Sequence, residues 1–138
     1  MERTLAIIKP DAVEDRVAGK ILARYEEEGF KIVAMKMLHM TKDEAAEFYE
    51  VHKEQKFYND LCEFMSSGPC IPMLLEARNA IQKNRGLMGA TDPAEAEEGT
   101  LRKLYARSKQ NNAVHGSDGP DTAEDEIKFF FSKLEMVS

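Results

Sequence analysis

One histidine stands where the sequence could place a nucleophile or a general base. His115 follows the apolar pair Ala113 and Val114 and precedes a Gly-Ser-Asp turn, in the segment NAVHGSD at 112–118. A histidine at the end of a strand and beside a glycine is exposed and fixed at once, as nucleophilic and general-base catalysis require. The alternative is a surface or hydrogen-bonded histidine without a catalytic role, and this segment alone does not decide between the two.

The sequence contains neither of the glycine-rich patterns that cradle phosphates, G-x-x-x-x-G-K-[ST] and G-x-G-x-x-G. If the chain handles nucleotides, side chains must therefore hold the phosphates. The basic candidates near expected strand ends or loops are Lys9, Arg85, Arg102 and Lys103. Each of them alone is also consistent with a solvated surface charge. Lys9 is the most informative, because it ends a buried apolar run directly before Pro10 and Asp11.

Composition limits the classes of function. The 138 residues suit one compact domain, and the net charge of −6 argues against nucleic acid as the main partner. An anionic small molecule would need a local basic cluster instead. Cys62 and Cys70 are too few for a disulfide scaffold and are expected to be small core residues. The apolar run near the N-terminus is too short for a signal peptide, and no window reaches the length of a membrane span. These features predict a cytoplasmic protein without membrane contact.

The elements that would position these residues follow from hydrophobic patterning. Strands are expected at 4–9, 30–40, 70–77 and around 112–118. Helices are expected at 13–28, 41–53, 59–65, 79–85, 101–109 and from Thr122, with Ile127, Phe130 and Phe131 facing inward. Thr41-x-x-Glu44 is a capping-box pattern, and residues 86–99 should be mostly loop. The order predicts an α+β, ferredoxin-like βαββαβ domain over 1–138, with helices packed on one face of a four-stranded antiparallel sheet.

Five segments spread over nearly the whole chain carry a resemblance to a known family. They are TLAIIKPDAV at 4–13, EEGFKIVAMK at 27–36, FMSSGPCIPMLLE at 64–76, GLMGATDPAEAEEGTLR at 86–102 and NAVHGSD at 112–118. In this order they resemble the nucleoside diphosphate kinases, and NAVHGSD resembles the active-site motif of that family. Five collinear matches are far more specific than one short motif.

The resemblance implies a reaction. Enzymes of this family transfer the γ-phosphoryl group of nucleoside triphosphates, chiefly ATP, to nucleoside diphosphates. They do so in a ping-pong cycle through a phosphohistidine, which maintains NTP and dNTP pools. The resemblance makes His115 the nucleophile. Glu126 would accept a hydrogen bond from the other ring nitrogen, and Ser117 would support Glu126. Without the resemblance, Glu126 would be read as an exposed helix acid.

The same resemblance implies the binding residues. Lys9 and Tyr49 would frame His115, and Phe57 would stack on the base, although its sequence context also suits a core residue. The phosphate and sugar contacts would come from Lys9, Tyr49, Arg85, Thr91, Arg102 and Asn112. Mg²⁺ would arrive with the nucleotide phosphates, and Asp118 would hold one of its waters rather than bind it directly.

Lys109 departs from the family pattern, which has an apolar residue on the other side of the base; the stem of the lysine could still cover the ring. The resemblance also implies a homo-oligomer, with hexamer and tetramer both open. The rival interpretation is a ferredoxin-like nucleotide- or RNA-binding module without catalysis. An RNA-binding sheet should show exposed aromatic and basic residues on its central strands, which the expected strands lack. A scaffold that has lost activity is disfavoured because every expected site position is filled.

Overall fold

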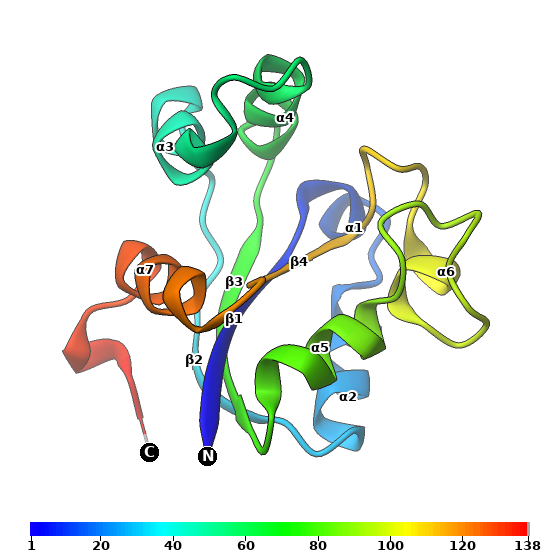
Figure 1. The fold of residues 1–138 in the computed structure, drawn as a ribbon, viewed down its shortest axis with the longest axis vertical. Coiled ribbons are helices and arrows are strands. Elements are labelled where there is room, and N and C mark those ends of the chain that lie inside the picture. Colours follow the sequence, from blue (N-terminus) through cyan, green and yellow to red (C-terminus); the bar gives the residue numbers. More distant parts are fainter. Residues whose placement is uncertain (138) are drawn as a thin grey trace.

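The computed structural model describes residues 1–137, which form a four-stranded sheet surrounded by helices (Figure 1). Every neighbouring pair of strands is antiparallel, and the spatial order is β2-β3-β1-β4. The strands are β1 (Glu2–Ile8), β2 (Lys31–Met35), β3 (Ile71–Ala77) and β4 (Val114–Gly116). The helices are α1 (Pro10–Glu14), α2 (Ala18–Glu27), α3 (Lys42–Phe48), α4 (Tyr58–Met65), α5 (Ala80–Met88), α6 (Leu101–Tyr105) and α7 (Pro120–Phe130), with 3₁₀ turns at Glu50–His52 and Lys133–Glu135. The predicted α+β, ferredoxin-like architecture is confirmed.

The prediction that the helices share one face of the sheet is wrong. In β1, Ala6 and Ile8 belong to a core with α2 and α5, whereas Leu5 and Ile7 belong to a second core with α3, α4 and α7. Figure 1 shows α7 on one side of the strands and α2 and α5 on the other. The physical reason is visible in the sequence. The end of β1 is apolar at four successive positions, Leu5 to Ile8, so both faces of the strand are buried there and both need a cover.

Several element boundaries differ from the predicted ones. The single helix expected at 13–28 is two helices, α1 and α2, because Arg16 takes a left-handed conformation with φ of 61°. The helix expected from Thr122 starts at Pro120, a residue suited to the first helical turn. The strand expected to reach Met40 ends at Met35, and only an isolated bridge between Leu38 and Cys70 continues its pairing.

The remaining differences are smaller. The helix expected at 41–53 is α3 followed by a 3₁₀ turn, and its predicted capping box is present. Helix α5 continues to Met88, beyond the expected end at Arg85, and α6 ends at Tyr105. Cys62 and Cys70 are buried, unbridged core residues, as expected. Within residues 1–137, no helix combines the length and apolar character needed to cross a membrane.

The short strand β4 carries His115 at the edge of the sheet. His115 pairs with Ile7 of β1, and the next residue is Gly116. A Cβ added at Gly116 would lie 2.5 Å from Nδ2 of Asn84 and 2.6 Å from Cε of Met88. Helix α5 therefore packs against β4 more closely than any residue with a side chain would permit. The histidine is thus fixed by strand pairing on one side and helix packing on the other.

Candidate active site

His115 is held by a carboxylate, and a hydroxyl holds that carboxylate in turn. Its Nε2 lies 3.0 Å from Oε1 of Glu126 on α7, and Oγ of Ser117 donates to the same carboxylate oxygen at 2.7 Å. A carboxylate acceptor favours the tautomer with the proton on Nε2, which leaves a lone pair on Nδ1. The His115 side chain is 18% exposed and that of Glu126 is 19% exposed. The ring is therefore oriented and partly accessible, as a nucleophile must be.

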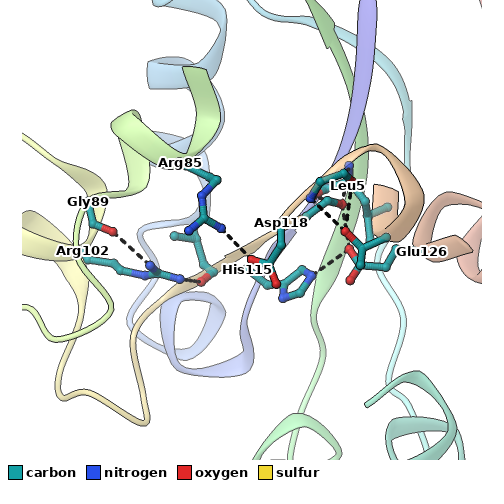
Figure 2. A network of polar contacts seen from close by, with 11 residues as sticks. Leu5, Arg85, Gly89, Arg102, His115, Asp118 and Glu126 are labelled. Carbon is teal, nitrogen blue, oxygen red and sulfur yellow. Dashed lines mark hydrogen bonds and ion pairs between the residues drawn. The ribbon is translucent and has the colours of Figure 1, made fainter. Parts of the chain in front are cut away.

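Ser117 connects this pair to the sheet. Its Oγ also lies 3.3 Å from the backbone nitrogen of Leu5, which donates to it, and its own N–H donates to the Leu5 carbonyl at 3.1 Å. Ser117 is almost fully buried. Ser117, expected from the resemblance to support Glu126, thus lies between Glu126 and β1, and Figure 2 shows His115, Glu126 and Leu5 drawn together.

Aromatic rings enclose the other side of His115. The Phe48 ring lies edge-on at 5.5 Å between centroids, and the Tyr49 ring lies edge-on at 6.1 Å. Tyr49 is only 5% exposed, and its hydroxyl has no hydrogen-bond partner among residues 1–137. Burial, followed by the charge of Glu126, raises the pKa of that hydroxyl, so it stays protonated. The Tyr49 hydroxyl is therefore a buried donor near His115 without a protein acceptor in residues 1–137, which calls for an explanation.

Lys9 is a buried cation at the end of β1. It is 7% exposed, and its Nζ donates to Oδ1 of Asn112 at 2.9 Å. The Asn112 amide in turn donates to the Thr91 carbonyl at 3.2 Å, which joins three of the predicted binding residues. The pKa of Lys9 is lowered from 10.5 to about 8, first by burial and then by the positive charge of Arg102, while the negative charge of Asp11 opposes both.

Two arginines continue the site from His115 toward α5 and α6. The Arg102 guanidinium donates to the Gly89 carbonyl at 3.0 Å and to the Val114 carbonyl at 2.9 Å, directly before His115. Arg85 forms an ion pair with Asp118 at 2.6 Å. Figure 2 shows these side chains beside the His115–Glu126 pair. Cationic side chains from the residue after β1 and from α5 and α6 thus lie close to the segment that carries His115, although Lys9 and Arg102 are 93 positions apart in the sequence.

The remaining predicted residues are more exposed to solvent. Phe57 is 48% exposed and lies 5.6 Å from the His52 ring, so it is available for stacking and is not part of the core. Thr91 is exposed. Lys103 and Lys109 are also exposed, and neither has a hydrogen bond or ion pair through its side chain within residues 1–137.

Sequence reasoning overlooked several residues that organise the site. Asp11 is 2% exposed and accepts a hydrogen bond from the Ala113 N–H at 3.0 Å. Asn84 is fully buried under Gly116 and accepts a hydrogen bond from the Tyr25 hydroxyl at 2.7 Å. The signal for Asp11 was its place directly after Lys9 and Pro10, since an acidic residue two positions from a buried lysine is near it in the chain. No local signal marks Asn84.

Comparison with known proteins shows to which family the chain belongs. The family model for nucleoside diphosphate kinase matches residues 2–136. The chain belongs to the nucleoside diphosphate kinase family. The predicted resemblance is therefore confirmed, and the protein is an enzyme, a nucleotide-binding kinase.

Relatives named as nucleoside diphosphate kinases match over almost the full length of this family member. One from Citrifermentans bemidjiense is 59% identical over 137 residues, covering 99% of this chain and 100% of its own. One from Persephonella marina is 58% identical over 137 residues, covering 99% of this chain and 98% of its own. The kinase is thus similar to these relatives from end to end.

Solved structures agree with the fold of the kinase. The Aquifex aeolicus nucleoside diphosphate kinase superposes with a TM-score of 0.97 at 47% identity, covering 99% of both chains. The enzyme from Halobacterium salinarum, solved in complex with CDP, superposes with a TM-score of 0.95 at 38% identity, covering 99% of this chain and 91% of its own.

Proposed function

We propose that this kinase transfers the γ-phosphoryl group from nucleoside triphosphates, chiefly ATP, to nucleoside diphosphates through a phosphohistidine on His115, and that it thereby maintains NTP and dNTP pools. The observation that carries the proposal is the contact between Nε2 of His115 and Glu126 at 3.0 Å. It directs the Nε2 proton to a carboxylate and leaves the Nδ1 lone pair free to attack phosphorus.

The reaction balances in two halves. In the first, Nδ1 of His115 forms a bond to the γ-phosphorus while the bond from that phosphorus to the β–γ bridging oxygen breaks. The electron pair leaves with the nucleoside diphosphate. In the second, a terminal β-phosphate oxygen of the acceptor diphosphate attacks the phosphohistidine, and Nδ1 recovers its lone pair. Glu126 stabilises the positive charge that develops on the ring, and Ser117 fixes the Glu126 carboxylate.

The cationic side chains supply the remaining charge stabilisation. Lys9 and Arg85 offset charge on the phosphoryl group as it moves, and Arg102 and Thr91 hold the distal phosphates. A loose phosphoryl-transfer transition state leaves little covalent work to the protein, so positioning and electrostatics carry most of the rate. The buried setting of Lys9 supports this role, because a cation removed from water interacts more strongly with phosphate oxygens than an exposed one does.

The nucleoside is held by stacking and by a polar contact to the sugar. Phe57 provides an exposed aromatic face for the base, Asn112 reaches the ribose, and the Tyr49 hydroxyl contributes a free donor beside the phosphates. Stacking does not discriminate among bases, since every base has an aromatic face. Broad use of nucleotides follows, and the CDP complex of the Halobacterium salinarum relative supports nucleotide binding at such a site.

A divalent metal, Mg²⁺, suits this site as a companion of the nucleotide. Within residues 1–137, no group of three or more His, Cys, Asp or Glu side chains could hold a metal ion. Asp118 is 76% exposed and shares its charge with Arg85, which suits a carboxylate that contacts a metal-bound water. When bound with the nucleotide, Mg²⁺ supplies charge neutralisation on the phosphate oxygens. The protein residues hold the phosphates and orient His115.

The proposal extends to assembly and location. We expect a homo-oligomer, either a hexamer or a tetramer, acting in the cytoplasm. Size-exclusion chromatography with light scattering, on the sample used for activity, distinguishes the two assemblies.

Transient labelling tests the proposed nucleophile. Incubated with γ-labelled ATP and Mg²⁺, the protein should acquire an acid-labile, base-stable label and pass it to GDP or dCDP. His115→Ala should acquire none. His39→Ala is the matched control, because the one side-chain hydrogen bond of His39 within residues 1–137 is to the Ser66 carbonyl, and this variant should label like the wild type. If His115→Ala still takes up label and transfers it, His115 is not the nucleophile.

A further inference from the structure

Asp11 lies at the base of the site and has no role in the proposed phosphoryl transfer. It is the second residue of α1, and only 2% of it is exposed. Its Oδ2 accepts the hydrogen bond from the backbone N–H of Ala113 at 3.0 Å, and its Oδ1 has no partner among residues 1–137. Burying a carboxylate with half of its acceptors unused is costly, so this residue needs an explanation.

The hydrogen bond to Ala113 falls on a strained position. Ala113 has a φ of 73°, in the left-handed region that alanine rarely adopts. Its N–H is taken by Asp11, and its carbonyl accepts the backbone N–H of Lys9 at 2.8 Å. The Lys9-Pro10-Asp11 segment therefore binds both the N–H and the carbonyl of Ala113, the residue that precedes β4. Asn112 and His115, on either side of this turn, receive their directions from it.

The charge of Asp11 acts on the buried Lys9. From α6, the Arg102 cation disfavours a charged Lys9, and from α1 the Asp11 anion favours it. The loop before β4 contributes only the neutral amide of Asn112. Asp11 thus offsets part of the burial that lowers the pKa of Lys9 to about 8. Without that anion, the lysine would lose its proton at a lower pH.

We propose that Asp11 is a positioning residue for phosphoryl transfer: its carboxylate holds the left-handed turn at Ala113, whose carbonyl binds the Lys9 backbone N–H, and its negative charge acts on the Lys9 ammonium at longer range than an ion pair. This inference rests on the proposed function for its effect on rate, but its two structural parts can be measured without catalysis. Glu14, which follows on the same helix with its side chain 77% exposed, pairs with Arg107 and, within residues 1–137, has no hydrogen bond or ion pair to Ala113 or Lys9, so it offers a matched carboxylate.

Two substitutions separate the two parts. Asp11→Asn retains an oxygen that accepts the Ala113 N–H and removes the charge, whereas Asp11→Ala removes both. For Asp11→Asn we expect the alkaline limb of kcat/KM, measured with ATP and GDP, to shift to lower pH by about one unit. After normalisation at pH 6, transfer at pH 8 should then be about fivefold below that of the wild type. Glu14→Gln should keep the wild-type profile, and Asp11→Ala should melt at a lower temperature than Asp11→Asn.

The pKa of Lys9 can be measured without any activity by following its ¹³Cε resonance in an NMR titration. This resonance is assigned by its absence from the spectrum of Lys9→Met. In Asp11→Asn the midpoint should fall below that of the wild type. An unchanged midpoint, or an unchanged alkaline limb in an active variant, overturns the charge role of Asp11. A wild type that fails to transfer phosphate contradicts the proposed function instead and leaves this titration decisive for Asp11.

The turn has its own test should Asp11→Asn fail to fold. Glycine adopts a positive φ freely, so adding Ala113→Gly should restore folding to Asp11→Asn and raise the melting temperature of Asp11→Ala. If Ala113→Gly gives neither variant any rescue, Asp11 does not hold the turn.

Discussion

Replacing Lys9 by methionine should stabilise the folded protein while it abolishes phosphoryl transfer. The lysine is 7% exposed, and burial is the largest cause of the fall in its pKa from 10.5 to about 8. At about 1.4 kcal/mol for each pKa unit, this fall of about 2.5 means that the charged side chain destabilises the fold by about 3 kcal/mol at neutral pH. Methionine fills a similar volume without the charge.

The loss of one hydrogen bond offsets part of this gain. Nζ of Lys9 donates to Oδ1 of Asn112 at 2.9 Å, and a buried amide oxygen without its donor costs about 1–2 kcal/mol. We therefore expect Lys9→Met to raise the free energy of unfolding by about 1–2 kcal/mol at pH 7. For a chain of this length, that corresponds to a melting temperature about 5 °C higher. Transfer from ATP to GDP should fall by about two to three orders of magnitude, as for loss of one well-aimed cation.

The direction of the Lys9 pKa shift determines how the stability difference between Lys9→Met and the wild type depends on pH. Because the pKa of Lys9 is lower in the folded state than in the unfolded chain, the unfolded state binds more protons between pH 8 and 10.5. The penalty is complete below pH 8 and disappears as pH rises through this window. The advantage of Lys9→Met over the wild type should therefore be largest near pH 7 and vanish by about pH 10.

The assay is thermal and urea unfolding of both proteins at pH 7, 8.5 and 10 and at one protein concentration. Lys20→Met, an exposed substitution on α2, is the control and should change stability by less than about 0.5 kcal/mol at every pH. The inference that burial disfavours the charged form of Lys9 would be refuted by a Lys9→Met protein less stable than the wild type at pH 7. A stability difference between the two proteins that stays constant from pH 7 to 10 would refute it as well.

Three further substitutions have outcomes fixed by local geometry. Tyr49→Phe removes a hydroxyl without a hydrogen-bond partner in residues 1–137. The free energy of unfolding should therefore rise by about 1 kcal/mol, and kcat in the ATP-to-GDP assay should fall. A less stable variant would mean that the hydroxyl has a hydrogen-bond partner in solution. Phe57→Ala truncates a side chain that is 48% exposed; calorimetry should show little change, whereas KM should rise about tenfold for GDP and CDP alike. An effect on one base only would exclude simple stacking. Gly116→Ala places a Cβ 2.5 Å from Asn84, and urea unfolding should show a loss of about 1–3 kcal/mol; wild-type stability would mean that α5 can move away from β4.

Local chemistry explains which parts of the fold the sequence predicted. The capping box at Thr41 and Glu44 needs only residues three apart, and both of its hydrogen bonds are present, at 2.8 and 3.1 Å. The break at Arg16 has no such signal. Left-handed helix ends favour glycine or asparagine, and an arginine gives no indication of one. The cover on both faces of the sheet was readable from the uninterrupted apolar run of β1, but the prediction followed element order instead.

Local sequence predicts much less of the site than of the fold, because the contacts of the site join residues that are distant in the chain. Lys9 and Asn112 lie 103 residues apart, and nothing in either local segment indicates their hydrogen bond. Only the family resemblance brought such residues into one predicted site. The ion pair between Arg85 and Asp118 and the buried carboxylate of Asp11 were not foreseen. Each depends on how α1, α5 and the turn after β4 pack together.

The features that oppose folding gather around the proposed nucleophile. A desolvated ammonium at Lys9, an unpartnered hydroxyl at Tyr49 and a left-handed alanine at Ala113 each disfavour the native state, and all belong to the surroundings of His115. A sequence selected for stability alone would replace each of them at small cost. A phosphate group would satisfy the first two, since it accepts from the hydroxyl and neutralises the ammonium, whereas the alanine shapes the turn that precedes His115. The local departures from good folding chemistry therefore point to the same anionic ligand as the family does.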